Sequence, residues 1–75
     1  MNVTKTLDCI GLFCPMPVVK TKLELEQLKP GDTLEILADD IGFEKDLPAW
    51  CELSGVEFLE IQKDGKILKG YVRKI

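Results

Sequence analysis

Segments with a helical pattern alternate with segments that have a strand pattern along this chain, and turn signals separate them. The run Lys29-Pro30-Gly31-Asp32 ends a first helix, because proline and glycine both interrupt helical structure. The run Asp39-Asp40-Ile41-Gly42 breaks the strand that follows that helix. The expected elements, in chain order, are a strand over 3–8, a helix over 15–28, a strand over 33–38, a helix over 43–54, and strands over 56–62 and 67–74.

The second helix is predicted from apolar residues that recur at spacings of four, three and one. They are Phe43, Leu47, Trp50 and Cys51. This spacing places them on one helix face, so Cys51 and Trp50 are expected in the core. The alternative for Trp50 is a role as an anchor for a partner protein. The start of the helix is open, because Asp46 followed by Pro48 also suits a cap and first turn. Gly55 suits the position just past its end.

The last two strands are expected to form a hairpin. Between them, Lys63-Asp64-Gly65-Lys66 contains an Asp-Gly pair, which is typical of a tight turn between antiparallel strands. The alternation of apolar and polar residues slips between Phe58 and Leu59, which predicts a bulge or a twist there.

This order of elements indicates a two-layer α+β sandwich. The order is β-α-β-α-β-β, and a crossover through the first helix makes the first two strands parallel. Two helices most economically cover one face of a four-stranded mixed sheet. The chain has 75 residues, which is one domain over 1–75. A domain of this size buries only about 60% of its unfolded surface, so its chemistry is expected near the surface.

Charge and cysteine content exclude several classes of function. The chain has 13 acidic and 10 basic residues and no basic run, so direct nucleic-acid binding is not expected. Its apolar stretches are too short for a membrane span or a signal peptide. It has three cysteines and no histidine, and the cysteines lack the paired short spacing of a zinc site. Free thiols in a reducing, cytoplasmic compartment are the better interpretation.

Cys14 is the candidate reactive residue, because it directly precedes the first predicted helix. Proline is favoured at the first helical position, so Pro15 is expected there, Cys14 at the N-cap and Pro17 at the third position. The N–H groups of Met16 and Val18 would then remain to face an anion, and a helix N-terminus favours a thiolate. The alternative is that Cys14 is a small apolar residue that closes the loop.

The segment around Cys14 resembles the TusA family of small sulfur carriers, also called SirA-like. The family pattern is Asp, two variable residues, Gly-Leu, one variable residue and Cys-Pro-x-Pro, which matches Asp8 to Pro17 here. The likeness extends over almost the whole chain. The further matching blocks are Leu28-Lys29-Pro30-Gly31-Asp32, Asp39-Asp40, Asp46-Leu47-Pro48-Ala49-Trp50 and Val72-Arg73-Lys74.

The resemblance implies that Cys14 carries a sulfane sulfur as a persulfide, with Pro15 and Pro17 framing it and Gly11 shaping its loop. The donor it implies is a pyridoxal-phosphate cysteine desulfurase or a rhodanese-like protein. The acceptor is a protein with a reactive cysteine, on a route to thiolated tRNA, cofactor synthesis or sulfur metabolism. This is a sulfurtransferase-type relay without independent turnover, and the resemblance implies no bound cofactor of its own.

Two alternatives remain open at this point. Cys9 lies at a position that the family pattern leaves variable, and it is either an incidental loop residue or a thiol that resolves a Cys14 persulfide or forms a disulfide with Cys14. A thiol-disulfide switch is therefore one rival function, and an adaptor module that binds partners without its thiol is the other.

The first helix also predicts a docking surface. Val18, Thr21, Leu25 and Leu28 are expected to face the sheet. Val19 and Leu23 lie toward the side and are expected to be only partly covered. Met16, Leu12 and Phe13 lie near the sulfur in sequence, and one of the last two is expected to plug the end of the core.

Overall fold

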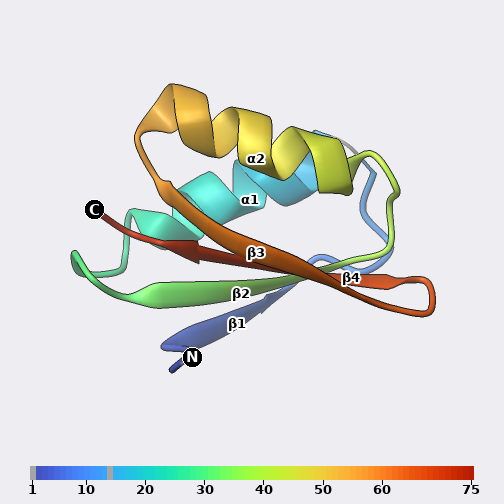
Figure 1. Cartoon of the computed structure of the whole chain (residues 1–75), viewed down its shortest axis with the longest axis horizontal. Coiled ribbons are helices and arrows are strands. Elements are labelled where there is room, and N and C mark those ends of the chain that lie inside the picture. The colour runs from blue at the N-terminus through green and yellow to red at the C-terminus, as the bar shows by residue number, and fades with distance from the viewer. Residues whose placement is uncertain (1, 14) are drawn as a thin grey trace.

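Four strands form one mixed sheet, and two helices lie on the same face of it (Figure 1). The computed structural model describes residues 2–13 and 15–75. The elements are β1 (Lys5–Asp8), α1 (Met16–Leu25), β2 (Thr33–Ala38), α2 (Phe43–Ser54), β3 (Glu57–Asp64) and β4 (Ile67–Arg73). The predicted two-layer α+β fold is confirmed.

The strands lie in the order β1-β2-β4-β3. β1 and β2 are parallel, with Leu7 opposite Ile36, and β4 is antiparallel to both β2 and β3. The register of β3 against β4 shifts between Phe58 and Glu60, so the expected bulge is confirmed. β2 and β4 are the central strands, and β1 and β3 form the two edges.

The core lies between the sheet and the two helices. The side chains of Leu34, Ile36 and Ala38 in β2 are fully buried, as the alternation of this strand predicts. Residues of both helices and of β4 complete the core; these include Leu25, Phe43, Leu47, Cys51, Leu68 and Val72. Each large apolar side chain buried here contributes about 1.5–3 kcal/mol to folding.

The helices also contact the edge strands through ion pairs. Lys5 of β1 pairs with Glu24 of α1. Lys63 of β3 pairs with Glu44 of α2, with 3.0 Å between Nζ and Oε2. These cations therefore point toward the helix layer, and each pair lies at the margin of the core where the apolar layer ends.

The predicted start of α2 at Phe43 is confirmed, and the alternative start near Pro48 is wrong. Gly42 is the N-cap, and its carbonyl accepts the N–H of Asp46 at 3.0 Å. Pro48 lies inside the helix. Gly55 ends the helix with φ 74°, a left-handed conformation that glycine adopts without strain.

Several boundaries differ from the sequence-based prediction. β1 begins at Lys5 rather than at residue 3, and β4 ends at Arg73 rather than at residue 74. α1 ends at Leu25 rather than Leu28, because the N–H groups of Gln27 and Leu28 bond to carbonyls three residues back and tighten the chain into turns. In the hairpin, Asp64 still pairs with Ile67, so the loop is Gly65-Lys66. Gly65, the first residue of this loop, has φ 62°, whereas Lys66 does not have a positive φ. A positive φ at the first loop residue alone is typical of a type II′ turn.

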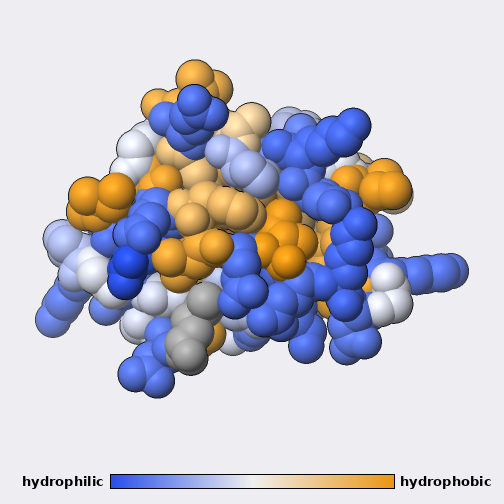
Figure 2. All heavy atoms as spheres, viewed as in Figure 1, coloured by the Kyte–Doolittle hydropathy of each residue, from blue (hydrophilic) through white to orange (hydrophobic). Residues whose placement is uncertain are grey.

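Hydrophobic residues reach the surface in the face shown in Figure 2, between the helices and the sheet, and hydrophilic residues surround them. Among residues 2–13 and 15–75, no helix is both long enough and apolar enough to cross a membrane.

Candidate functional site

The β1–α1 connection, which carries the candidate residue Cys14, lies at one end of the molecule. The β2–α2 loop and the β3–β4 hairpin lie at the same end, on the right in Figure 1. Cys14 itself lies outside the described residues. The residues on both sides of it, Phe13 and Pro15, are described.

Hydrogen bonds shape the loop before Cys14. The Cys9 N–H donates to the Leu37 carbonyl at 2.7 Å and so continues the pairing of β1 with β2. The Ile10 N–H donates to Asp8 Oδ1 at 2.9 Å. Gly11 has φ 85°, and its N–H donates to Asp39 Oδ1 at 3.0 Å. This left-handed conformation suits glycine, which has no Cβ atom.

The Cys9 side chain lies inside the core. This side chain is fully buried. The backbone carbonyl of Cys9 accepts the N–H of Leu12 at 3.2 Å. Burial raises the pKa of the Cys9 thiol, the positive charge of Lys20 opposes this, and Asp8 adds to it. Cys9 is therefore protonated near neutral pH, and it can reach another thiol only if this end of the core opens.

The start of α1 corrects the predicted helix position by one residue. The Pro15 carbonyl accepts the Val19 N–H at 3.0 Å, which is the first bond of the α-helical type, so Pro15 is the N-cap and Met16 the first helical residue. The prediction of Pro15 at the first position and Cys14 at the N-cap is wrong. Pro17 occupies the second position, where its missing N–H still costs no intrahelical bond.

The expected free N–H groups at this helix end are also wrong. The Met16 N–H donates to the Phe13 carbonyl at 2.9 Å. The Val18 N–H donates to the Pro15 carbonyl at 3.1 Å. Both N–H groups therefore donate to backbone carbonyls of this chain. An anion at this end of α1 would still be stabilised by the positive end of the helix dipole.

Apolar side chains are exposed on both sides of the candidate residue. Phe13 is 77% exposed, whereas Leu12 is half-buried and packs on the core, so one of the two plugs the core as expected. Met16 is 43% exposed at the start of α1. Farther along the helix, Val19 and Leu23 are exposed, whereas Thr21 and Leu25 are buried. The expected buried face of α1 is confirmed at Thr21 and Leu25. Val18, which the sequence also places toward the sheet, is only half-buried and is not part of the core cluster.

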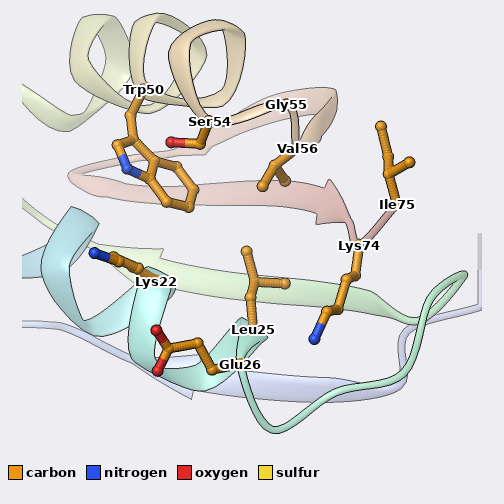
Figure 3. A pocket seen from close by; sticks show the side chains of 9 residues that line it. All are labelled: Lys22, Leu25, Glu26, Trp50, Ser54, Gly55, Val56, Lys74 and Ile75. Carbon is orange, nitrogen blue, oxygen red and sulfur yellow. The ribbon is translucent and has the colours of Figure 1, made fainter.

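Trp50 and Cys51 lie where the helical pattern places them. Cys51 is buried, and burial raises the pKa of its thiol to about 11. Trp50 is half-buried against the core and also lines a groove of about 340 Å³ (Figure 3). The groove lies between the ends of α1 and α2 and the C-terminal segment, at the opposite end of α1 from the candidate site.

Asp39 has a role that the sequence analysis did not identify, since the run Asp39-Asp40-Ile41-Gly42 was interpreted only as a break after a strand. Asp8 and Asp40 make local bonds two residues along the chain, and Asp40 Oδ1 accepts the Gly42 N–H at 3.3 Å. Asp39 instead reaches across to Gly11, 28 residues away in the chain. Its signal in the sequence was its place directly after a strand that pairs in parallel with β1. Within the described chain, no group of three His, Cys, Asp or Glu residues could hold a metal ion.

The fold defines a class of small protein. The crystal structure of a SirA-like protein from Desulfitobacterium hafniense matches this structure with a TM-score of 0.80. The two chains are 27% identical, and the match covers 92% of this chain and 95% of that one. The chain belongs to the TusA family, since the family described as "Sulfurtransferase TusA" matches residues 5–74.

Relatives within the family bear names of sulfur carriers. "Putative sulfur carrier protein YrkI" of Bacillus subtilis is 43% identical over 74 residues, which cover 99% of each chain. "Putative sulfur carrier protein YrkF" of the same organism is 47% identical over 74 residues, but this chain spans only 40% of its length. A relative from Halobacterium salinarum with the same description is 43% identical, over 97% of this chain and 91% of its own. Family membership therefore supports a role as a sulfur carrier.

Proposed function

We propose that this protein carries sulfur as a persulfide on Cys14 and passes it from a donor protein to an acceptor protein. One observation carries the proposal: in a chain of the TusA family, Cys14-Pro15-Met16-Pro17 lies where the β1–α1 loop enters α1. The described neighbours of Cys14 on both sides, Phe13 and Pro15, are exposed. A sulfur on Cys14 would therefore lie near the surface.

The chemistry consists of two thiol exchange steps. In the first, the Cys14 thiolate attacks the terminal sulfur of the donor persulfide. A sulfur–sulfur bond forms to Cys14, the bond within the donor breaks, and the donor cysteine leaves as a thiolate with the electron pair. The proton stays on the transferred sulfur. In the second step the acceptor thiolate attacks that sulfur, and Cys14 leaves as the thiolate, so the cycle needs no net oxidant or reductant.

The donor is a cysteine desulfurase or a rhodanese-like protein, and the acceptor is a protein with a reactive cysteine. Both partners must approach the same sulfur, so they share the surface around it. That surface comprises the exposed side chains of Phe13, Met16, Val19 and Leu23. Flexible methionine and other apolar side chains can repack against different partners, which suits a carrier that serves more than one.

A persulfide-transfer assay tests the proposal. The protein is incubated with a cysteine desulfurase and cysteine, and its intact mass and modified peptide are then determined by mass spectrometry. We expect the mass of one added sulfur atom, located on Cys14. The Cys14→Ser variant should take up no sulfur, whereas Cys9→Ser and Cys51→Ser should take it up as the parent does.

The same mass measurement separates the first rival function, and the activity of Cys14→Ser in the cell separates the second. A thiol-disulfide switch would show the loss of two hydrogen atoms and a link between Cys9 and Cys14 instead of added sulfur. The burial of Cys9 speaks against that outcome. If the protein were an adaptor module, the Cys14→Ser variant would keep full biological activity. That result would contradict the proposal.

A further inference from the structure

A single carboxylate connects the loop that carries Cys14 to the neighbouring loop. Asp39 directly follows β2, and Gly11 lies three residues after the end of β1. Because β1 and β2 are parallel, with Asp8 opposite Leu37, both loops leave the sheet at the same edge. The 3.0 Å bond from the Gly11 N–H to Asp39 Oδ1 joins them there.

The Cys9 N–H bond to the Leu37 carbonyl anchors the start of the loop to β2, and the bond to Asp39 is the one that anchors its middle. The bonds from the Ile10 N–H to Asp8 and from the Leu12 N–H to Cys9 close within the loop itself. They fix its local shape but not its placement against the rest of the molecule. The bond to Asp39 holds the middle of the loop, at Gly11, to the start of the β2–α2 loop.

We propose that Asp39 is a positioning residue for sulfur transfer: its carboxylate holds the Gly11 amide and so sets how the following loop presents Cys14 to partner proteins. The inference rests on the proposed function of Cys14. Thiol exchange requires the attacking, transferred and leaving sulfur atoms to lie nearly in line, and small errors of placement are costly in such reactions. Asp39 acts here through the geometry of one oxygen atom, not through its negative charge.

Two substitutions separate geometry from charge. Asp39→Asn keeps an acceptor oxygen at the same place but removes the charge, whereas Asp39→Glu keeps the charge but moves the oxygen by one methylene. Asp39→Ala removes both. Asp39 is exposed, so these variants are expected to fold. Glu52→Ala, which removes an exposed carboxylate on α2, is the matched control.

The measurements are the rate of sulfur transfer from a cysteine desulfurase charged with cysteine, and the hydrogen-exchange rate of the Gly11 amide by NMR. We expect Asp39→Ala to lower the transfer rate by roughly tenfold, the factor that corresponds to about 1.4 kcal/mol, and to speed exchange at Gly11. Asp39→Glu should show the same defects in weaker form. Asp39→Asn and Glu52→Ala should remain close to the parent in both measurements.

The pH dependence of Cys14 alkylation by a small reagent provides a readout that does not involve docking. Its midpoint should be unchanged in Asp39→Asn, since the charge is not the operative feature. A midpoint that moves, or a transfer rate that falls in Asp39→Asn as far as in Asp39→Ala, would overturn the proposal. So would parent-like transfer by Asp39→Ala while Cys14 still takes up sulfur, and that result would leave the proposed function standing. A parent protein that acquires no sulfur on Cys14 would overturn both.

Discussion

The cysteines of this protein have different surroundings, and burial separates two of them from the candidate site. The Cys51 side chain is 1% exposed and the Cys9 side chain is fully buried. Burial disfavours the charged thiolate, which is why the pKa of each thiol is raised. Reactivity of a cysteine requires both access and thiolate, so neither residue meets the requirement in the folded state.

We predict that a thiol reagent at neutral pH labels Cys14 alone in the native protein. Labelling of Cys9 and Cys51 should require denaturant, because each lies in the core. Peptide mapping by mass spectrometry after a timed reaction measures this. Rapid native labelling of Cys51 would contradict its place in the core, and rapid labelling of Cys9 would show that the end of β1 opens readily.

At the scale of elements, α1 has a buried face and an exposed face. Thr21 and Leu25 face the core, and the Thr21 hydroxyl donates to the Pro17 carbonyl at 2.7 Å, so this buried polar group is satisfied. Val19 and Leu23 point away from the core. The exposed face begins next to the candidate site, which is where a partner would arrive.

We predict that Val19→Glu and Leu23→Glu weaken sulfur transfer by roughly tenfold each, because truncating or charging a central contact commonly costs more than 1 kcal/mol of binding. The fold and the alkylation rate of Cys14 should stay close to those of the parent, since both side chains are exposed. Gln62→Glu adds the same charge on β3 and is the control. Parent-like transfer by both variants would place the docking surface elsewhere, and loss of the fold would contradict the assigned faces of α1.

The packing of α2 on β4 depends on the absence of a side chain at Gly70. A Cβ atom there would lie 2.6 Å from Leu47 Cδ2 and 3.0 Å from Phe43 Cε2, both closer than normal contacts. We predict that Gly70→Ala destabilises the protein by about 1–3 kcal/mol, the usual cost of overpacking a core. Denaturant unfolding monitored by Trp50 fluorescence measures it.

Gly42→Ala is the matched control for that measurement. The nearest atom to a Cβ at Gly42 is 3.5 Å away, which is an ordinary contact, and its backbone φ of −62° suits any residue. Its cost should be clearly smaller. Equal losses in the two variants would show that close approach of α2 to β4 is not the cause.

For the molecule as a whole, buried acids set the response to alkaline pH. The pKa of Cys51 rises from 9.0 to about 11 on burial. The pKa of Tyr71 rises to about 12, first because its hydroxyl donates to Glu35 Oε2 at 2.6 Å and then because it is largely buried. In both cases the folded state keeps its proton at a pH where the unfolded chain has lost it, so stability falls as pH rises.

We therefore predict a loss on the order of 2 kcal/mol between pH 9.0 and about 11 from Cys51 alone. The full contribution is present below pH 9.0 and disappears as the pH rises toward the folded-state pKa. Denaturant midpoints measured across this range test the prediction. Cys51→Ala should be less stable at neutral pH because of the cavity, but its stability should fall less steeply with pH; an unchanged slope would refute the assignment to Cys51.

The sequence by itself determined the elements and the class of fold, because these follow from local periodicity and turn chemistry. The β2 and α2 boundaries at Thr33–Ala38 and Phe43–Ser54 are as predicted, and the slip at Phe58 revealed the bulge. The sequence also predicted that the Cys14 motif precedes a helix, because that prediction depends only on adjacent residues.

The tertiary structure decided what depends on contacts between distant parts of the chain. The strand order β1-β2-β4-β3, the burial of Cys9 beneath its own loop and the reach of Asp39 to Gly11 all arise from pairings that no local pattern encodes. The start of α1 moved by one residue because a helix begins where the first carbonyl is used, and here the Pro15 carbonyl accepts the Val19 N–H. Local sequence sets which bonds are possible, and the folded chain selects among them by packing.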